Sequence, residues 1–184
     1  LKNVLQYLEL STEKNKEKIA IIEEEKSISY NDLLKNSKRI GTVLSNYIDL
    51  RNPVGVLMEK GIDSLVSFFG TAYAGGFYVY LNSDLPVARL KKIIEVADIK
   101  VIITNENKLE LAKEISENIE IIKIVDTQKE EIDETKLENI RKKALDVDPL
   151  YANFTSGSTG EPKGVVISHR SVIDFINVFT DKFL

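Results

Sequence analysis

The chain has 184 residues, a length that allows one compact domain with a sizeable apolar core. Its 25 Lys and Arg residues stand against 29 Asp and Glu residues, and the net charge of −4 gives no electrostatic footprint for nucleic acid or an anionic membrane. The lack of Cys excludes disulfides and thiol nucleophiles, and a single histidine, His169, excludes a multi-histidine metal site. No apolar run is long enough for a membrane span, and a secretory hydrophobic block is missing, so we expect a cytoplasmic setting.

The first half of the chain alternates short β-branched runs with longer amphipathic segments. In chain order, the predicted elements up to residue 81 are strands 18–23 and 27–30, helix 31–47, strand 53–58, helix 63–74 and strand 77–81. Asn31 is predicted to cap the first of these helices, and Gly75 and Gly76 to end the second.

The second half continues the alternation. In chain order, the predicted elements are a helix opened by Pro86, strand 100–104, helix 107–115, strand 119–125, a charged surface excursion over 126–148 with one short helix, strands 150–154 and 164–167, and a final helix capped by Ser168 or Ser171. Strands that alternate with helices predict an α/β fold, a mostly parallel sheet with flanking helices and right-handed crossovers.

The segment 155–164 combines glycines, hydroxyl residues and a lysine. Its glycines allow positive φ and close backbone approach to a ligand, and its free N–H groups form an anion-binding concavity. Lys163 adds a positive charge suited to phosphate. The other members of this set are Thr155, Ser156, Gly157, Ser158, Thr159, Gly160 and Gly164.

This loop is distinct from two common phosphate-binding motifs. A Walker A motif needs Gly-Lys-Ser/Thr five positions after its first glycine, but Pro162 stands five positions after Gly157, and Gly164 follows Lys163. A Rossmann Gly-x-Gly-x-x-Gly is also missing. A flexible linker is the alternative on composition alone. Strand-like runs on both sides argue against it, and they predict a loop between two strands where a Walker A loop would lead into a helix.

Residues 151–165, Tyr-Ala-Asn-Phe-Thr-Ser-Gly-Ser-Thr-Gly-Glu-Pro-Lys-Gly-Val, closely resemble the signature of the adenylate-forming superfamily. That superfamily includes nonribosomal peptide synthetase adenylation domains, D-alanine–carrier protein ligases and acyl-CoA synthetases. The continuation over 166–172, Val-Ile-Ser-His-Arg-Ser-Val, is similar to the segment that follows the loop in adenylation domains.

Weaker similarities to the same family lie upstream in the right order, at 28–33 and 54–79. The sequence departs from the family pattern at Tyr80, where proline is common, and at Asn82, where aspartate is common. It returns to the pattern at 85–90. The departures therefore blur the assignment to a subfamily, but they do not affect the assignment to the superfamily.

The resemblance implies that 1–184 is the N-terminal portion of the AMP-binding (adenylation) domain. The downstream subdomain and the C-terminal domain would be absent, which agrees with a chain that begins with Leu. The implied reaction uses ATP and Mg²⁺ to convert a carboxylic acid, with an amino acid favoured, into its acyl-adenylate. A second step then passes the acyl group to a phosphopantetheinyl carrier protein or domain. The implied ATP-phosphate site consists of Thr155, Ser156, Gly157, Ser158, Thr159, Gly160, Lys163 and Gly164. In the family, the catalytic lysine and the adenine and ribose contacts lie further along, so we expect no catalytic residue and no metal ligand within 1–184, and an inactive fragment.

Two alternatives stay open. One is an acyl-CoA synthetase for fatty or aryl acids, and the other is a non-catalytic module that binds phosphate or docks to a partner. A truncated domain would expose apolar surface, so we also expect self-association.

Several other residues favour structural roles. His169 is expected to cap or pack at a helix start, Asp63 to lie at a helix N-cap or first turn, and Arg89 to form an ion pair or cap. Glu161 is expected to point to solvent. Core packing explains the aromatic set better than a ligand cage. That set is Phe68, Phe69, Tyr73, Phe77, Tyr78 and Tyr80.

Overall fold

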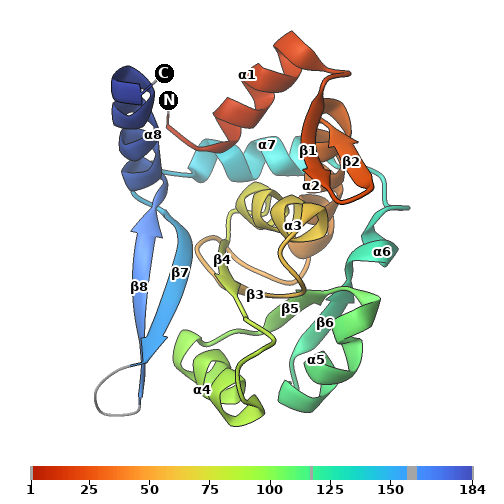
Figure 1. Ribbon diagram of the computed structural model, residues 1–184, viewed down its shortest axis with the longest axis vertical. Coiled ribbons are helices and arrows are strands. Elements are labelled where there is room, and N and C mark those ends of the chain that lie inside the picture. Colours follow the sequence, from red (N-terminus) through yellow and green to blue (C-terminus); the bar gives the residue numbers. More distant parts are fainter. Residues whose placement is uncertain (1, 117, 157–160, 184) are drawn as a thin grey trace.

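A mostly parallel sheet forms the centre of the computed structural model, which describes residues 2–116, 118–156 and 161–183. Within those residues, six strands lie in the order β6-β5-β3-β4-β7-β8 (Figure 1). They are β3 (Pro53–Leu57), β4 (Phe77–Tyr80), β5 (Val101–Thr104), β6 (Glu120–Lys123), β7 (Pro149–Ser156) and β8 (Pro162–Ser168). All neighbours up to β7 pair in parallel, and β8 pairs antiparallel with β7. The predicted α/β fold with a mostly parallel sheet is confirmed.

Helices cover both faces of this sheet, because its central strands are apolar on both sides. Val54 and Val56 of β3 belong to one core cluster, which also holds residues of α2 (Tyr30–Leu44) and α3 (Ile62–Tyr73). Leu57, the next residue of β3, belongs to a second cluster with residues of α4 (Val87–Ala97) and α5 (Leu109–Ile115). Successive strand residues point to opposite faces, so α2 and α3 lie on one face and α4 and α5 on the other.

The pair of short strands predicted near the N-terminus is confirmed as an antiparallel hairpin of β1 (Ile19–Glu23) and β2 (Lys26–Ser29), and it lies apart from the main sheet. The helix α1 (Leu5–Asn15) before it was not predicted. Its buried face includes Thr12, whose hydroxyl donates to the Leu8 carbonyl at 2.7 Å, and this polar position interrupts the apolar repeat.

Several predicted boundaries were wrong, and the helix predicted over 31–47 ends at Leu44. The cap of α2 is Ser29, whose Oγ accepts a hydrogen bond from the Asp32 N–H at 3.0 Å, whereas Asn31 already lies in the first turn. The strand predicted over 119–125 ends at Lys123, and the chain turns into the short helix α6 (Ile124–Thr127). The charged region that follows contains α7 (Glu134–Lys143), and the 3₁₀ helix η1 (Glu106–Lys108) precedes α5. Gly75, at φ 78°, ends α3 as predicted.

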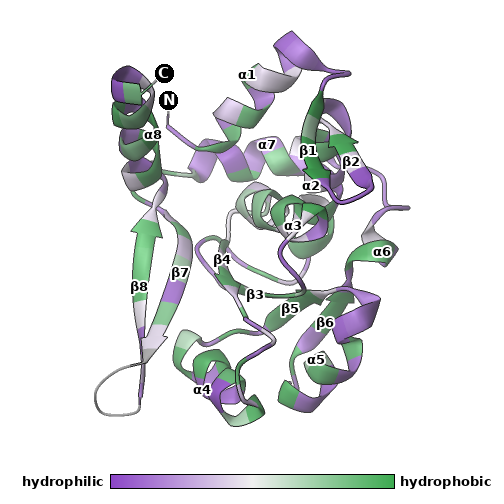
Figure 2. Cartoon of the chain, in the orientation of Figure 1, coloured by the Kyte–Doolittle hydropathy of each residue, from purple (hydrophilic) through white to green (hydrophobic). Residues whose placement is uncertain are grey.

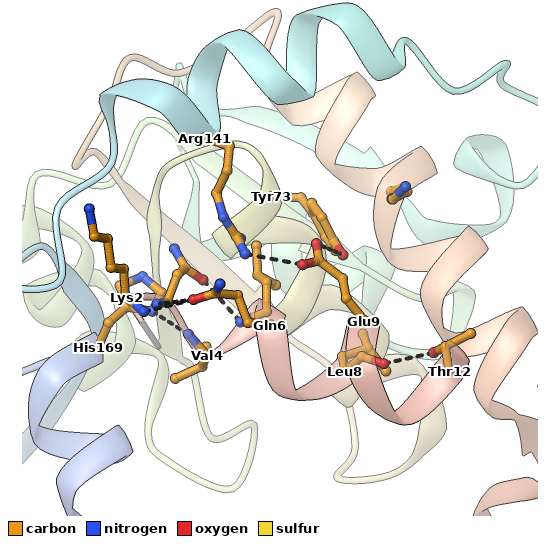
Figure 3. A network of polar contacts seen from close by, with 12 residues as sticks. Lys2, Val4, Gln6, Leu8, Glu9, Thr12, Tyr73, Arg141 and His169 are labelled. Atoms are coloured by element: carbon orange, nitrogen blue, oxygen red, sulfur yellow. Dashed lines mark hydrogen bonds and ion pairs between the residues drawn. The ribbon is translucent and has the colours of Figure 1, made fainter. Parts of the chain in front are cut away.

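The final helix α8 (His169–Phe183) begins beside the N-terminal segment (Figure 1). Its cap is Ser168, whose Oγ accepts from the Ser171 N–H at 3.2 Å. Next to this start, Figure 3 shows polar contacts that join α1 to its neighbours. The Glu9 carboxylate accepts from the Tyr73 hydroxyl at 2.9 Å and forms an ion pair with Arg141 at 3.2 Å. In the part of the chain that the structure describes, no helix is long and apolar enough to cross a bilayer.

Candidate functional site

The hairpin of β7 and β8 holds the glycine-rich segment at its turn (Figure 1). β7 is the last parallel strand, and β8 returns beside it with Thr155 opposite Lys163 and Ser156 opposite Pro162. The prediction that this segment lies between two strands is confirmed. A Walker A loop would instead lead from a strand into a helix.

The structure brings two of the predicted site residues together at the end of the hairpin. Thr155 and Lys163 are direct partners across the strand pair, and both are exposed. Side chains of directly opposite residues stand on the same face of an antiparallel pair. The Thr155 hydroxyl and the Lys163 ammonium group therefore leave the hairpin on one face. Four other predicted residues, Gly157, Ser158, Thr159 and Gly160, lie outside the described residues.

Gly164 lies close to the Phe154 ring within the hairpin. It pairs with Phe154, and a Cβ atom at position 164 would lie 2.9 Å from Phe154 Cζ. Phe154 and Ala152 pack in the core cluster shared with α4. Alternation along β7 then places Tyr151, Asn153 and Thr155 on the opposite face, so one side of the hairpin is anchored in the core and the other carries the exposed polar groups.

Contacts from α4 reach both ends of the loop. Arg89 Nη2 donates to the Thr155 carbonyl oxygen at 2.8 Å, and Lys92 Nζ lies 3.4 Å from a Glu161 carboxylate oxygen. Glu161 is 63% exposed, so the expectation that it faces solvent is confirmed, with an ion pair in addition. Two hydrogen bonds raise the pKa of Lys92. The one from its ammonium group to Glu95 has the larger effect, and the one to Glu161 has the smaller effect. No local signal in the sequence connects Arg89 with the loop, because 66 positions separate it from Thr155.

Aromatic rings form a ladder on the face of β4 and β7 that carries Thr155. Phe68 stacks on Tyr78 with centroids 4.0 Å apart, and Tyr78 stacks on Tyr151 at 5.4 Å. Burial raises the pKa of Tyr78 to about 12. The core packing predicted for the aromatic set is confirmed for Phe68 and Tyr78, which pack against the core cluster of α2 and α3. The rings of Phe68, Tyr78 and Tyr151 also line an open groove of about 470 Å³ together with Lys60 and Asn153. This groove was not expected from the sequence.

Two further residues have the structural roles predicted for them. His169 is 3% exposed and lies at the far end of β8 from the loop, where its Nδ1 accepts from the Val4 N–H at 3.4 Å. Burial and the nearby Arg141 charge lower its pKa to about 4. Asp63 lies in the first turn of α3, and burial, with help from the Glu23 charge, raises its pKa. Across the described residues, no three His, Cys, Asp or Glu side chains are grouped closely enough to hold a metal ion.

Known proteins are similar to this chain in sequence and in fold. Residues 8–183 match the family described as "AMP-binding enzyme". Tyrocidine synthase 1 of Brevibacillus parabrevis is 25% identical over 183 residues, which cover 99% of this chain and 16% of that protein. Gramicidin S synthase 2 of Brevibacillus brevis is 28% identical over 176 residues, which cover 95% of this chain and 4% of that protein.

Among solved structures, the nonribosomal peptide synthetase FmoA3 in its alpha-methyl-L-serine-AMP bound form has a TM-score of 0.84 at 21% identity. The match covers 98% of this chain and 20% of that one, and it shows a common fold. The chain thus spans less than a fifth of the length of the two curated relatives. Because the family match extends over nearly all of the 184 residues, the chain belongs to the AMP-binding enzyme family.

Proposed function

We propose that this chain is the ATP-phosphate-binding portion of a carboxylate–AMP ligase. The observation that carries the proposal is the pairing of Thr155 with Lys163 at the mouth of the glycine-rich loop. This pairing places a hydroxyl donor and a cation on one face, beside a segment whose composition suits phosphate. Residues 1–184 would form the N-terminal portion of the adenylation domain.

In the proposed reaction, an oxygen of the substrate carboxylate bonds to the α-phosphorus of ATP. The bond from that phosphorus to the bridging oxygen breaks, and pyrophosphate leaves with the electron pair. Negative charge grows on the departing group, so Lys163 and Thr155 stabilise the transition state if they hold the β- and γ-phosphates. The other proposed phosphate contacts are Ser156, Gly157, Ser158, Thr159, Gly160 and Gly164.

Mg²⁺ fits this site as a companion of the nucleotide. Mg²⁺ is commonly held by substrate phosphates, water and one or two carboxylates. Thr155 would supply a hydroxyl oxygen near the proposed phosphate position, and the phosphates and water would supply the other ligands, because Lys92 holds the Glu161 carboxylate in an ion pair. The ion, when bound, would neutralise phosphate charge. Lys163 and Thr155 would then orient the triphosphate.

An amino acid is the proposed carboxylate, and the thiol of a phosphopantetheinyl carrier protein or domain is the proposed acceptor. The likeness of 154–160 and 169–171 to amino-acid-adenylating enzymes supports this choice, as do the matches to tyrocidine synthase 1 and gramicidin S synthase 2. In the second step, the thiolate would bond to the acyl carbon, and AMP would leave.

Pyrophosphate exchange into ATP tests the proposal on the protein that carries this chain. A panel of amino acids, fatty acids and aryl acids is compared at a fixed ATP concentration. We expect exchange that depends on one or a few amino acids. Exchange with fatty or aryl acids alone would replace the amino acid in the proposal, and no exchange with any carboxylate would reject the ligase.

A further inference from the structure

One turn of α4 carries two cationic side chains that contact the two ends of the glycine-rich loop. Arg89 Nη2 donates to the carbonyl oxygen of Thr155, where β7 enters the loop. Lys92 forms an ion pair with Glu161, one residue before β8 begins. Residues three apart are neighbours on the surface of a helix. Arg89 and Lys92 therefore form one contact surface that spans the base of the loop.

The helix beneath this surface is fixed in the core. Leu90, Ile93 and Ile94 of α4 are almost fully buried, in the cluster that also holds Ala152 of β7. Phe154 packs against the same cluster and lies close to Gly164 across the hairpin. Close-packed side chains resist displacement, so α4 and the base of the hairpin share one rigid support.

Arg89 contacts β7 beyond the residues that pair with the parallel strand β4. β4 pairs with β7 at Tyr151 and Ala152, and Thr155 lies three residues further on. A guanidinium donor forms a strong, directional hydrogen bond to a carbonyl oxygen. The contact thus holds the strand end at the last described positions before the loop.

Lys92 also alters the charge at the loop. Glu161 is an acidic side chain within a segment that we propose to hold phosphate, and a like charge there would oppose binding. The Lys92 ammonium group lies 3.4 Å from Glu161 and 3.3 Å from Glu95. It therefore offsets the Glu161 charge and draws that side chain towards α4.

We propose that Arg89 and Lys92 are positioning residues that hold both ends of the phosphate loop on α4. Ordering a glycine-rich loop around a ligand costs conformational entropy, and fixing its ends beforehand lowers that cost. The effect on ATP rests on the proposed function above. The holding of the loop ends is a property of the chain itself and is tested without nucleotide.

A charge swap tests the Lys92–Glu161 contact in the 184-residue chain. The variants are Lys92→Glu, Glu161→Lys and the double variant, and the readout is hydrogen exchange at the backbone amides of Thr155, Glu161 and Lys163. We expect each single change to accelerate exchange about threefold or more, and the double variant to return it towards the original rate, because the pair is restored with opposite polarity. Lys113→Glu, which breaks the exposed i,i+3 ion pair with Glu110 on α5, is the control and should leave these amides unchanged.

Arg89→Met and Arg89→Lys test the other contact, since methionine removes the donor and lysine keeps a charged one. We expect Arg89→Met to accelerate amide exchange at Thr155 and, in pyrophosphate exchange by the protein that carries this chain, to raise KM for ATP about tenfold with a smaller change in kcat. Arg89→Lys should recover part of both effects, and the unfolding midpoint of both variants should stay close to that of the Lys113→Glu control.

The outcomes separate this proposal from the proposed function. Unchanged amide exchange in Arg89→Met and in the charge-swap series would overturn it, whatever the activity. Faster amide exchange with an unchanged KM for ATP would also overturn it, because the loop ends would then be held without consequence for the nucleotide. If the unmodified protein shows no pyrophosphate exchange, the ligase proposal fails, and the amide rates alone decide whether α4 holds the loop.

Discussion

Gly70 of α3 lies so close to Ile40 of α2 that a Cβ atom at position 70 would stand 2.4 Å from Ile40 Cγ2. Gly41 of α2 has the matching relationship with Tyr73, since its Cβ would lie 2.5 Å from Tyr73 Cβ. The two glycines let the helix backbones approach closely over the sheet face that β3 and β4 supply. This approach depends on the absence of side chains at two facing positions.

Gly70→Ala is therefore expected to destabilise the fold, although alanine is the better helix former. Helix propensity favours the change by roughly 1 kcal/mol, whereas forcing a methyl group into a packed contact costs typically about 1–3 kcal/mol. Here the clash falls on the branched Ile40 side chain, so we expect a net loss of about 1 kcal/mol or more in the free energy of unfolding. Urea denaturation measures it. Asn139→Ala on the exposed face of α7 is the control, and a Gly70→Ala protein as stable as that control would contradict the packing argument.

His169 predicts a pH dependence of stability. Its pKa is lowered from 6.5 to about 4 in the folded protein, chiefly by burial, so the unfolded chain binds a proton more readily. The free energy of unfolding is therefore not reduced by His169 above pH 6.5, and it decreases as the pH falls towards 4, where the unfolded chain takes up the proton first. A shift of this size corresponds to roughly 3 kcal/mol at most, because one pKa unit is about 1.4 kcal/mol.

The measurement is urea denaturation at several pH values between about 7 and 4, for the unmodified chain and for His169→Asn. Asparagine keeps an acceptor for the Val4 N–H and has no titration in this range. We expect a smaller loss of stability on acidification in the variant. Parallel curves for the two proteins would assign the acid sensitivity to other groups.

Much of the fold could be predicted because its signals are local. The apolar runs that became β3 and β5, and the glycine at position 75 that ends α3, act within a few residues of themselves. The missed helix α1 has no such signal, since Thr12 interrupts its apolar face and satisfies its hydroxyl on the carbonyl of Leu8. Ser29 and Asn31 both suit a helix cap by residue type, and only the observed geometry selects Ser29.

The site was predicted in part for the same reason. The glycines, the hydroxyl residues and Lys163 lie within one short segment, so a phosphate-binding role can be predicted for them from the sequence. The hydrogen bond from Arg89 to Thr155 joins positions far apart in the chain, and it depends on the crossover that places α4 beside the hairpin. No spacing rule connects such residues.

The exposed apolar face of α8 predicts self-association of the 184-residue chain. Phe175, Phe179 and Phe183 recur every four residues with centroids 6.0 and 5.1 Å apart, and Phe175 is 67% exposed. The neighbouring β8 is also coloured hydrophobic over much of its length in Figure 2, and its Val165 and Val166 are exposed. Exposed apolar surface of this kind favours association. Light scattering at rising concentration should show growth in mean mass that Phe175→Ser and Phe179→Ser reduce, and a strictly monomeric chain would contradict the prediction.

Lys163 is expected to matter for nucleotide chemistry and little for folding. It is exposed on β8, so Lys163→Gln should change the free energy of unfolding by less than about 0.5 kcal/mol. Loss of one charged donor at a developing phosphate charge typically costs about 100-fold or more in kcat. Pyrophosphate exchange by the protein that carries this chain measures the effect. Lys142→Gln, an exposed change on α7, is the control, and equal activity of the two variants would remove Lys163 from the proposed site.

Binding of ATP–Mg²⁺ to the 184-residue chain alone should be weak or undetectable. The chain holds the proposed phosphate contacts, whereas the adenine and ribose contacts of the adenylate-forming family are expected outside it. Hydrogen bonds from a few charged or hydroxyl donors contribute about 1.5–3 kcal/mol each at best, and part of that is lost in ordering the loop. Isothermal titration with ATP, with tripolyphosphate and with adenosine separates the contributions. We expect the two phosphate compounds to bind with similar, weak affinity and adenosine not to bind. Tight stoichiometric binding of ATP, with adenosine as a competitor, would instead show a complete nucleotide site within these 184 residues.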